Sequence, residues 1–177
     1  MIRGLTKTRI LIMTVILAGF YFLLKDRLEN REENNHPISV GTSKGEDLEM
    51  YQTDIFSFQY PKGFVVNSYP VSGGGKIVAE RITGQKEGFQ IAFWPFDETG
   101  PLTIERIKKD IPDIEINNFR NIEIATDFPA VAFESADEIM GRTFEVWFIY
   151  KEKLYQVMTY PTFAEQMEKI LTTLRFE

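Results

Sequence analysis

Residues that carry much of protein chemistry are absent or scarce in this chain. None of its 177 residues is cysteine, which excludes disulfides, thiolate metal sites, iron–sulfur clusters and thiol nucleophiles. Its single histidine, His36, excludes a metal site built on a histidine pair and an acid–base scheme that needs two imidazoles. Basic residues are outnumbered, with 20 Lys and Arg against 26 Asp and Glu. The resulting net charge of −6 argues against binding of nucleic acid.

The common catalytic and phosphate-binding motifs give no candidate site. The one G-x-S-x-G pattern, Gly41–Gly45, lies in a polar segment with no strand before it and is not interpreted as a nucleophile turn. The glycines before Lys76 do not form a phosphate loop, because Pro70 and Ile77 occupy two of its required positions. Carboxylates remain as the only candidate catalysts, and none has the alternating spacing of a calcium loop. We therefore predict no catalytic residue, cofactor or metal, and a carboxylate hydrolase is the least favoured alternative. The acidic pairs considered are Asp97/Glu98, Asp110/Asp113 and Asp137/Glu138.

The strongest positive signal is an uncharged N-terminal segment, Ile10–Leu24, which reads ILIMTVILAGFYFLL. As a helix these residues span about 22 Å, shorter than a hydrocarbon core of about 30 Å, so the flanking Arg9 and Lys25 would have to extend to the headgroups. The apolar side chains favour insertion by about 3 to 6 kcal/mol. The segment is predicted to cross a membrane once as a helix.

Two other interpretations compete with a membrane anchor. A buried helix of a soluble protein normally keeps a polar edge, and this one is apolar all round. A cleaved signal peptide needs a small-residue cleavage site, but the chain continues FYFLLKDRLEN. We therefore predict an uncleaved signal anchor. Lys and Arg are balanced on its two sides, and the α-amino group favours a cytoplasmic N-terminus, with the C-terminal domain extracytoplasmic and the protein single-pass in the cell membrane.

Composition divides the chain into three parts. Residues 1–28 form the cytoplasmic tail and transmembrane anchor, residues 29–52 a flexible polar linker, and residues 53–177 a globular domain. The linker is dominated by charged and amide side chains, and Pro37, Gly41 and Gly45 interrupt any periodicity. His36 falls in this linker, where a lone histidine without partners is interpreted as a solvated spacer.

The globular part is predicted to be α+β, mainly an antiparallel β-sheet with helices packed on it. Pro61–Gly63 fits a tight connection, Lys151–Lys153 is typical of a hairpin turn, and the glycines at 73–75 indicate a flexible connection. Helices are expected at 103–110 and 163–173, the second with Thr162 as N-cap and Glu165 completing a capping box. Strands are expected at 55–60, 64–68, 76–82, 89–96, 115–125, 130–135, 142–150 and 154–160.

Several strands carry apolar side chains on both faces. In 142–150, Phe144 and Phe148 point to one face while Trp147 points to the other beside Glu145. Both faces of the sheet should therefore be covered at least in part. With two helices for two faces, some aromatic surface is expected to stay open for a partner, and the candidate residues are Trp94, Phe96 and Trp147. The alternative is that both tryptophans belong to the core.

Short motifs at both ends of the globular part resemble those of PsbP-like domains. Residues 55–64, IFSFQYPKGF, are similar to the family's opening strand and turn, F-S-F-x-Y-P-x-G-W, with Phe64 where Trp is common. Residues 170–176, ILTTLRF, are similar to its closing signature, I-L-x-S-F-x-F. The resemblance spans residues 53–177, and its motifs specify core and turns.

This resemblance implies a compact α-β-α sandwich that serves as an accessory or binding module and is not an enzyme. Members of the family assist photosystem II, and bacterial relatives include anchored envelope proteins. We therefore predict a membrane-anchored extracytoplasmic binding or assembly module, with the bilayer and an envelope protein as partners and with no nucleic acid. The alternative is a carrier of an apolar small molecule or lipid in a cleft between sheet and helix.

Overall fold

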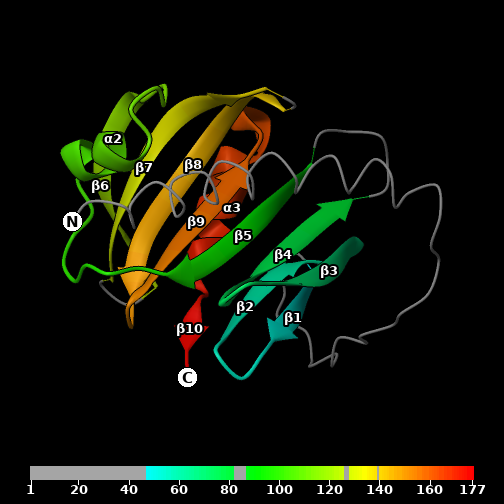
Figure 1. Cartoon of the computed structure of the whole chain (residues 1–177). Helices are drawn as coiled ribbons and strands as arrows, with labels where there is room; N and C mark the ends of the chain where they lie inside the picture. The colour runs from blue at the N-terminus through cyan, green and yellow to red at the C-terminus, as the bar shows by residue number, and fades with distance from the viewer. Residues whose placement is uncertain (1–46, 82–86, 126–127, 139) are drawn as a thin grey trace.

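The computed structural model describes residues 47–81, 87–125, 128–138 and 140–177 (Figure 1). The predicted anchor Ile10–Leu24 and His36 lie outside the described residues. Within the described ranges, every helix is too short or too polar to traverse a lipid bilayer.

A seven-stranded sheet forms the body of the domain, in the order β3-β4-β5-β9-β8-β7-β6, and every neighbouring pair is antiparallel. The hairpin predicted at residues 151–153 joins β8 and β9, while the tight connection predicted at 61–63 leads from one sheet to the other, and the sheet confirms the predicted antiparallel, mainly β class. The strands are β3 (Phe64–Val71), β4 (Gly74–Arg81), β5 (Gly88–Pro95), β6 (Asn117–Ile124), β7 (Phe128–Asp137), β8 (Gly141–Tyr150) and β9 (Lys153–Thr159).

A second, three-stranded sheet contains β1 (Leu48–Gln52), β2 (Phe56–Pro61) and β10 (Arg175–Phe176). Strand β1 corrects the predicted linker, which was expected to run to residue 52. Its residues are ordered because all five pair with β2, and the Tyr51 ring stacks on Phe58 at 5.3 Å. Strand β10 was also not expected, since two residues are too few to show a periodicity. The two ends of the domain thus meet in one sheet.

The described helices are α2 (Ile104–Asp110), a 3₁₀ turn (Pro161–Phe163) and α3 (Ala164–Thr172). Helix α2 starts one residue later than expected because Thr103 is its N-cap, and the Thr103 hydroxyl accepts from the Arg106 amide at 3.2 Å. The predicted capping box at Thr162 is wrong. Thr162 lies inside the 3₁₀ turn, and α3 begins directly from this turn without a side-chain cap.

The two faces of the larger sheet have different coverings (Figure 1). We call the face toward the smaller sheet and α3 the inner face; it holds the main core, including Phe56, Phe148, Tyr155 and Met167. The opposite, outer face packs against α2 through a smaller cluster of Leu102, Ile107, Val131, Phe133, Trp147 and Leu154. Figure 1 shows α2 and α3 on opposite sides of the β6–β9 end. Coverage of both faces, in part, is therefore confirmed.

The glycines at 73–75 form a tight turn and a close strand contact, where a flexible connection was expected. Strand β3 ends at Val71 and β4 begins at Gly74, and Gly73 adopts a positive φ of 75° in the turn. A Cβ on Gly75 would lie 2.7 Å from the Phe93 ring.

Gly75→Ala is therefore expected to lower the free energy of unfolding by about 1 to 3 kcal/mol, because the Phe93 ring must shift in a packed core. Urea denaturation measures the loss. Adding Phe93→Leu removes the ring atoms that the new Cβ meets, so the double variant should recover part of the stability. Independent, additive effects of the two changes would show that the clash is not the cause.

Candidate functional site

Buried polar side chains gather on the outer face of the larger sheet. Two residues that lie directly opposite each other on neighbouring strands point to the same face of the sheet. One row across the sheet runs Lys76–Ala92–Gln156–Trp147, and the next begins at Val78. Among the described residues, six of the seven buried polar side chains lie on this face: Lys76, Gln90, Ser135, Thr143, Glu145 and Gln156. The inner face is almost purely apolar, so any polar chemistry is concentrated on the outer one.

Three hydrogen-bond donors surround the small side chain of Ala92. Lys76 of β4 and Gln156 of β9 are its direct neighbours across the sheet, and Trp94 lies two residues along β5 on the same face. Gln156 is 5 % exposed, and its Nε2 has no hydrogen-bond partner among the described residues; the Nε1 of Trp94 is equally buried and unpartnered. Buried donors without acceptors are rare in folded proteins. We call Lys76, Trp94 and Gln156 the donor cluster.

Lys76 adds a positive charge to the donor cluster. Its side chain is only 6 % exposed, and its ammonium lies 5.4 Å from the centre of the Tyr69 ring. Burial lowers the pKa of Lys76, and no described carboxylate offsets this effect. The donor cluster therefore presents one cation and two neutral N–H groups, a combination that suits an acceptor oxygen with negative charge.

Glu145 lies on the same face but already has its partners. Its carboxylate accepts from Trp147 Nε1 at 2.7 Å and from Thr143 Oγ1 at 3.0 Å. Burial raises the pKa of Glu145 to about 7, against the opposing effect of these hydrogen bonds, and nearby Asp137 adds to the rise. The raised pKa is a property shared by catalytic acids and by buried structural ones. Glu145 does not line the cavity described below.

The three predicted partner residues have different environments. Trp147 is 2 % exposed, and its indole packs on Phe133 at 5.4 Å under the α2 region. Trp94 and Phe96 are half-buried at the end of β5 and pack against the rim of the same cluster. The guanidinium of Arg106 lies 4.6 Å from the Phe96 ring. The structure thus brings Trp94 and Phe96 together near a surface, while Trp147 is surrounded by core residues.

The structure shows where the acidic residues named as candidate catalysts lie. Asp97 and Glu98 both pair with Arg106, which also pairs with Asp110 within α2. Asp113 and Glu138 are exposed. Within the described ranges, no group of three His, Cys, Asp or Glu side chains is arranged to hold a metal ion.

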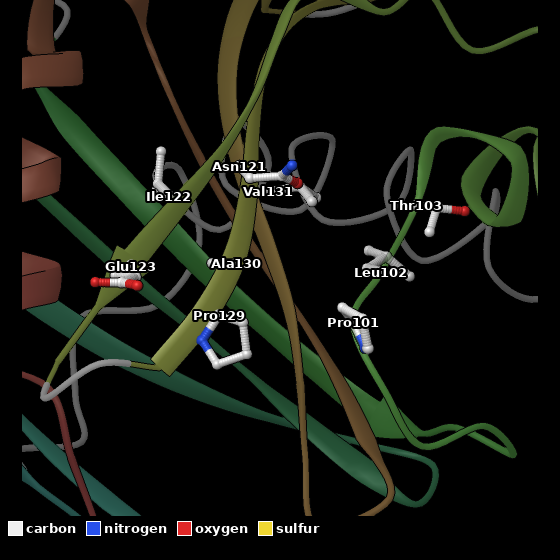
Figure 2. A pocket seen from close by; sticks show the side chains of 9 residues that line it. All are labelled: Pro101, Leu102, Thr103, Asn121, Ile122, Glu123, Pro129, Ala130 and Val131. Atoms are coloured by element: carbon white, nitrogen blue, oxygen red, sulfur yellow. The ribbon is translucent and has the colours of Figure 1, made fainter.

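A cavity of about 530 Å³ lies at the β6 edge of the outer face (Figure 2). Its apolar lining comes mainly from Leu102, Pro129 and Val131, while Asn121 and Glu123 are exposed at its side. Figure 2 shows β6 and β7 on one side and the segment 101–103 before α2 on the other. The lining contains no buried charged group, so the cavity suits an apolar ligand and offers no convergent chemistry.

Lys76, Gln156 and Glu145 are not among the site residues predicted from the sequence. Each interrupts an otherwise apolar strand, as Glu145 does between Phe144 and Val146. That interruption is a usable signal, because a charged or amide side chain at an inward position must find a partner or bind one. The sequence could not show that Lys76 and Gln156 share one neighbour, since 80 residues separate them.

No protein-family model and no curated protein matches the chain. Among solved structures, the chain is similar to the solution structure of cyanobacterial PsbP (CyanoP) from Synechocystis sp. PCC 6803. The TM-score is 0.50 at 14 % sequence identity, and the match covers 78 % of this chain and 98 % of that one. The described domain therefore has a PsbP-like fold, as the motifs at 55–64 and 170–176 predicted.

Proposed function

We propose that the protein is a membrane-anchored, extracytoplasmic binding or assembly module without catalytic activity. The PsbP-like fold is consistent with such a module. The observation that carries the proposal is the donor cluster, in which the buried N–H groups of Trp94 and Gln156 have no partner among the described residues and the ammonium of Lys76 lies on the same sheet face. Groups of this kind are completed by a binding partner, since leaving them buried and unpaired is costly.

The donor cluster also defines what the partner must offer. A carboxylate would pair with the ammonium of Lys76 and accept from the amide of Gln156, and apolar side chains would cover Val78 and Met158 beside it. We therefore propose an envelope protein that presents an acidic side chain within an apolar segment. Phe96 packs at the edge of the cluster under α2, while Trp147 is 2 % exposed and its indole N–H donates to Glu145.

The absence of catalytic activity is proposed on the surroundings of the acids. Glu145, the one described carboxylate with a strongly raised pKa, is held by two donors and is enclosed in the protein. A glycosidase-type mechanism needs a second carboxyl group facing the first across an open site. The apolar segment Ile10–Leu24 supports the membrane anchor and the extracytoplasmic location.

Site-specific photo-crosslinking in intact membranes tests the partner surface. A photoreactive amino acid at position 96 of the full-length chain should give a discrete protein adduct, and one at exposed Leu48 on the smaller sheet should not. Lys76→Met with Gln156→Leu removes two donors at similar volume and should abolish the adduct, because the partner loses its charged contact. Circular dichroism checks that the double variant folds.

Lys62→Met, at an exposed turn, is the matched control and should leave the adduct unchanged. An adduct that persists in the double variant would contradict the proposed surface. An adduct of lipid mass would instead favour the alternative function, a carrier of an apolar small molecule, for which the cavity beside Leu102 is the structural support. Recovery of the full-length protein in the soluble fraction alone would contradict the anchor.

A further inference from the structure

Strand β6 is the last strand on one side of the larger sheet, and no described strand pairs with its far side. In an antiparallel pair, hydrogen-bonded residue pairs alternate with pairs whose N–H and C=O groups point away from each other. Pro129 lies opposite Glu123 and has no N–H to donate, so this pair is of the second kind. Glu123, and Asn121 two residues before it, therefore direct their N–H and C=O groups to the open edge.

The β8–β9 hairpin indicates the same alternation independently. Both residues of its turn, 151–152, have positive φ, and a two-residue turn of this kind closes on a hydrogen-bonded pair, here Tyr150 and Lys153. It follows from the register that Trp147 is hydrogen-bonded to Val131 of β7. Val131 therefore directs its backbone groups to β8, and its partner on the other side, Asn121, directs its own to the open edge.

The opposite edge of the same sheet, β3, is protected in a way that β6 is not. The two-residue turn after β3 closes on Val71 and Gly74, so Pro70 directs its nitrogen to the open edge. A proline at such a position hinders the addition of a further strand, because it offers no N–H there. The two outward positions of β6, Asn121 and Glu123, are exposed and carry their N–H groups. Strand β6 can therefore accept another strand.

The cavity beside Leu102 adjoins this edge on the outer face (Figure 2). Its lining includes Asn121 and Glu123 of β6 and their direct partners on β7, Val131 and Pro129. A strand added to β6 would have two residues opposite Asn121 and Glu123, and their side chains would point to the outer face. An added polypeptide would therefore place alternate side chains at the cavity, which suits an apolar one.

Charge at the β6 edge favours a basic occupant. Glu123 is exposed on the outer face and makes no ion pair with the side chains that the structure describes. Arg120, the one basic residue of β6, is already paired with Glu168 of α3. The net charge of −6 opposes the pairing of two copies of the chain along this edge. A lysine or arginine of a different protein, placed beside Glu123, would complete the charge pattern.

We propose that residues 120–124 of β6 and the adjoining cavity bind an extended segment of a partner protein by strand addition. The segment pairs with the backbone of Asn121 and Glu123, places an apolar side chain in the cavity opposite Asn121, and places a lysine or arginine beside Glu123. Backbone hydrogen bonds supply affinity, and the cavity and the charge supply specificity. The site goes beyond the proposed function, because β7 and β8 separate it from the donor cluster.

A peptide array probed with the purified full-length protein tests the site. The probes are end-blocked peptides T-x-T-x-T, in which the two x positions, which share one face of a strand, vary over all residue types. Bound peptides should carry an apolar residue at one x position and lysine or arginine at the other. Fluorescence anisotropy of labelled copies then measures the affinity. Methylation of the peptide's backbone nitrogens removes its donors and should weaken binding at least about tenfold.

Asn121→Pro tests the backbone contact from the side of the protein. It removes an N–H that points to the open edge, so pairing with β7 is kept while the affinity for the peptide should fall at least about tenfold. Ser68→Pro, at an exposed outward position of β3, is the matched control and should leave the affinity unchanged. Glu123→Lys should change the selected charge from basic to acidic. Thermal unfolding identifies the folded variants, and Glu123→Lys decides the test if Asn121→Pro does not fold.

The outcomes separate this inference from the proposed function. An array without any bound peptide, or unchanged selection by Glu123→Lys, would overturn the inference. Equal binding of methylated peptides would also overturn it, because the cavity would then take an apolar group without strand pairing. Dimers that form without peptide and are lost in Asn121→Pro would identify a second copy as the occupant instead. Lys76→Met with Gln156→Leu, which tests the donor cluster, should leave peptide binding unchanged, so each proposal can fail while the other stands.

Discussion

Replacing Phe56 with alanine should lower the free energy of unfolding by about 3 to 5 kcal/mol, a large share of the stability of an ordinary domain. Phe56 is fully buried on β2, the central strand of the smaller sheet. Its ring lies edge-on to Phe93 at 5.7 Å and to Tyr155 at 6.0 Å, both on the larger sheet. The substitution would leave a cavity between the two sheets, which cannot close because each sheet is rigid.

Chemical denaturation with fluorescence detection measures this loss. Leu48→Ala is the control in the same small sheet, because Leu48 is 39 % exposed and its truncation should change stability by no more than about 0.5 kcal/mol. Phe56→Leu should fall between the two, since leucine refills part of the space. Similar losses for Phe56→Ala and Leu48→Ala would mean that Phe56 does not join the two sheets.

Domain stability should fall as the pH rises through the range in which Glu145 titrates. Folding raises the pKa of Glu145 from 4.5 to about 7, chiefly through burial of the carboxyl group. Between these values the folded protein holds the Glu145 proton and the unfolded protein releases it, so each rise in pH favours unfolding. The stabilisation that the folded protein gains from holding the Glu145 proton is fully present below pH 4.5 and is lost above about pH 7. It amounts to about 3 kcal/mol.

Glu145→Gln isolates this effect, because the amide oxygen can still accept from Trp147 and the side chain no longer ionises. The variant should match the parent protein near pH 5 and exceed its stability at pH 8, as measured by urea unfolding across this range. Glu123→Gln, at an exposed position of β6, is the control and should keep the parent's pH dependence, since Glu145 is intact. A pH profile of Glu145→Gln that parallels the parent's would contradict the assignment.

The two predictions reflect the different demands on the two sheet faces. The inner face joins both sheets and α3 through aromatic packing, so its residues are needed for the fold. The outer face tolerates Lys76, Gln90, Glu145 and Gln156 among apolar neighbours at a cost in stability. Side chains that weaken a fold and are nevertheless present are expected at binding surfaces. For this reason the proposed function rests on the outer face.

Local patterns predicted the elements whose signals lie within a few residues. Alternating aromatic side chains predicted the long strands, and the turn at 151–153 predicted the β8–β9 hairpin. Strand β1 was missed, because its Leu48–Gln52 sequence is half polar and becomes a strand only by pairing with β2. The capping box failed because Pro161 starts a 3₁₀ turn, which places Thr162 inside the turn and not at its start.

The sequence by itself determined the antiparallel β-rich class, the PsbP-like motifs, the absence of cysteine chemistry and the uncharged segment Ile10–Leu24. These depend on composition and on short-range periodicity. Only the tertiary structure decided that Lys76, Trp94 and Gln156 surround Ala92 and that Trp147 is buried beside Glu145. The physical reason is that strand order and register bring together residues far apart in the chain, and neither is encoded in any local pattern.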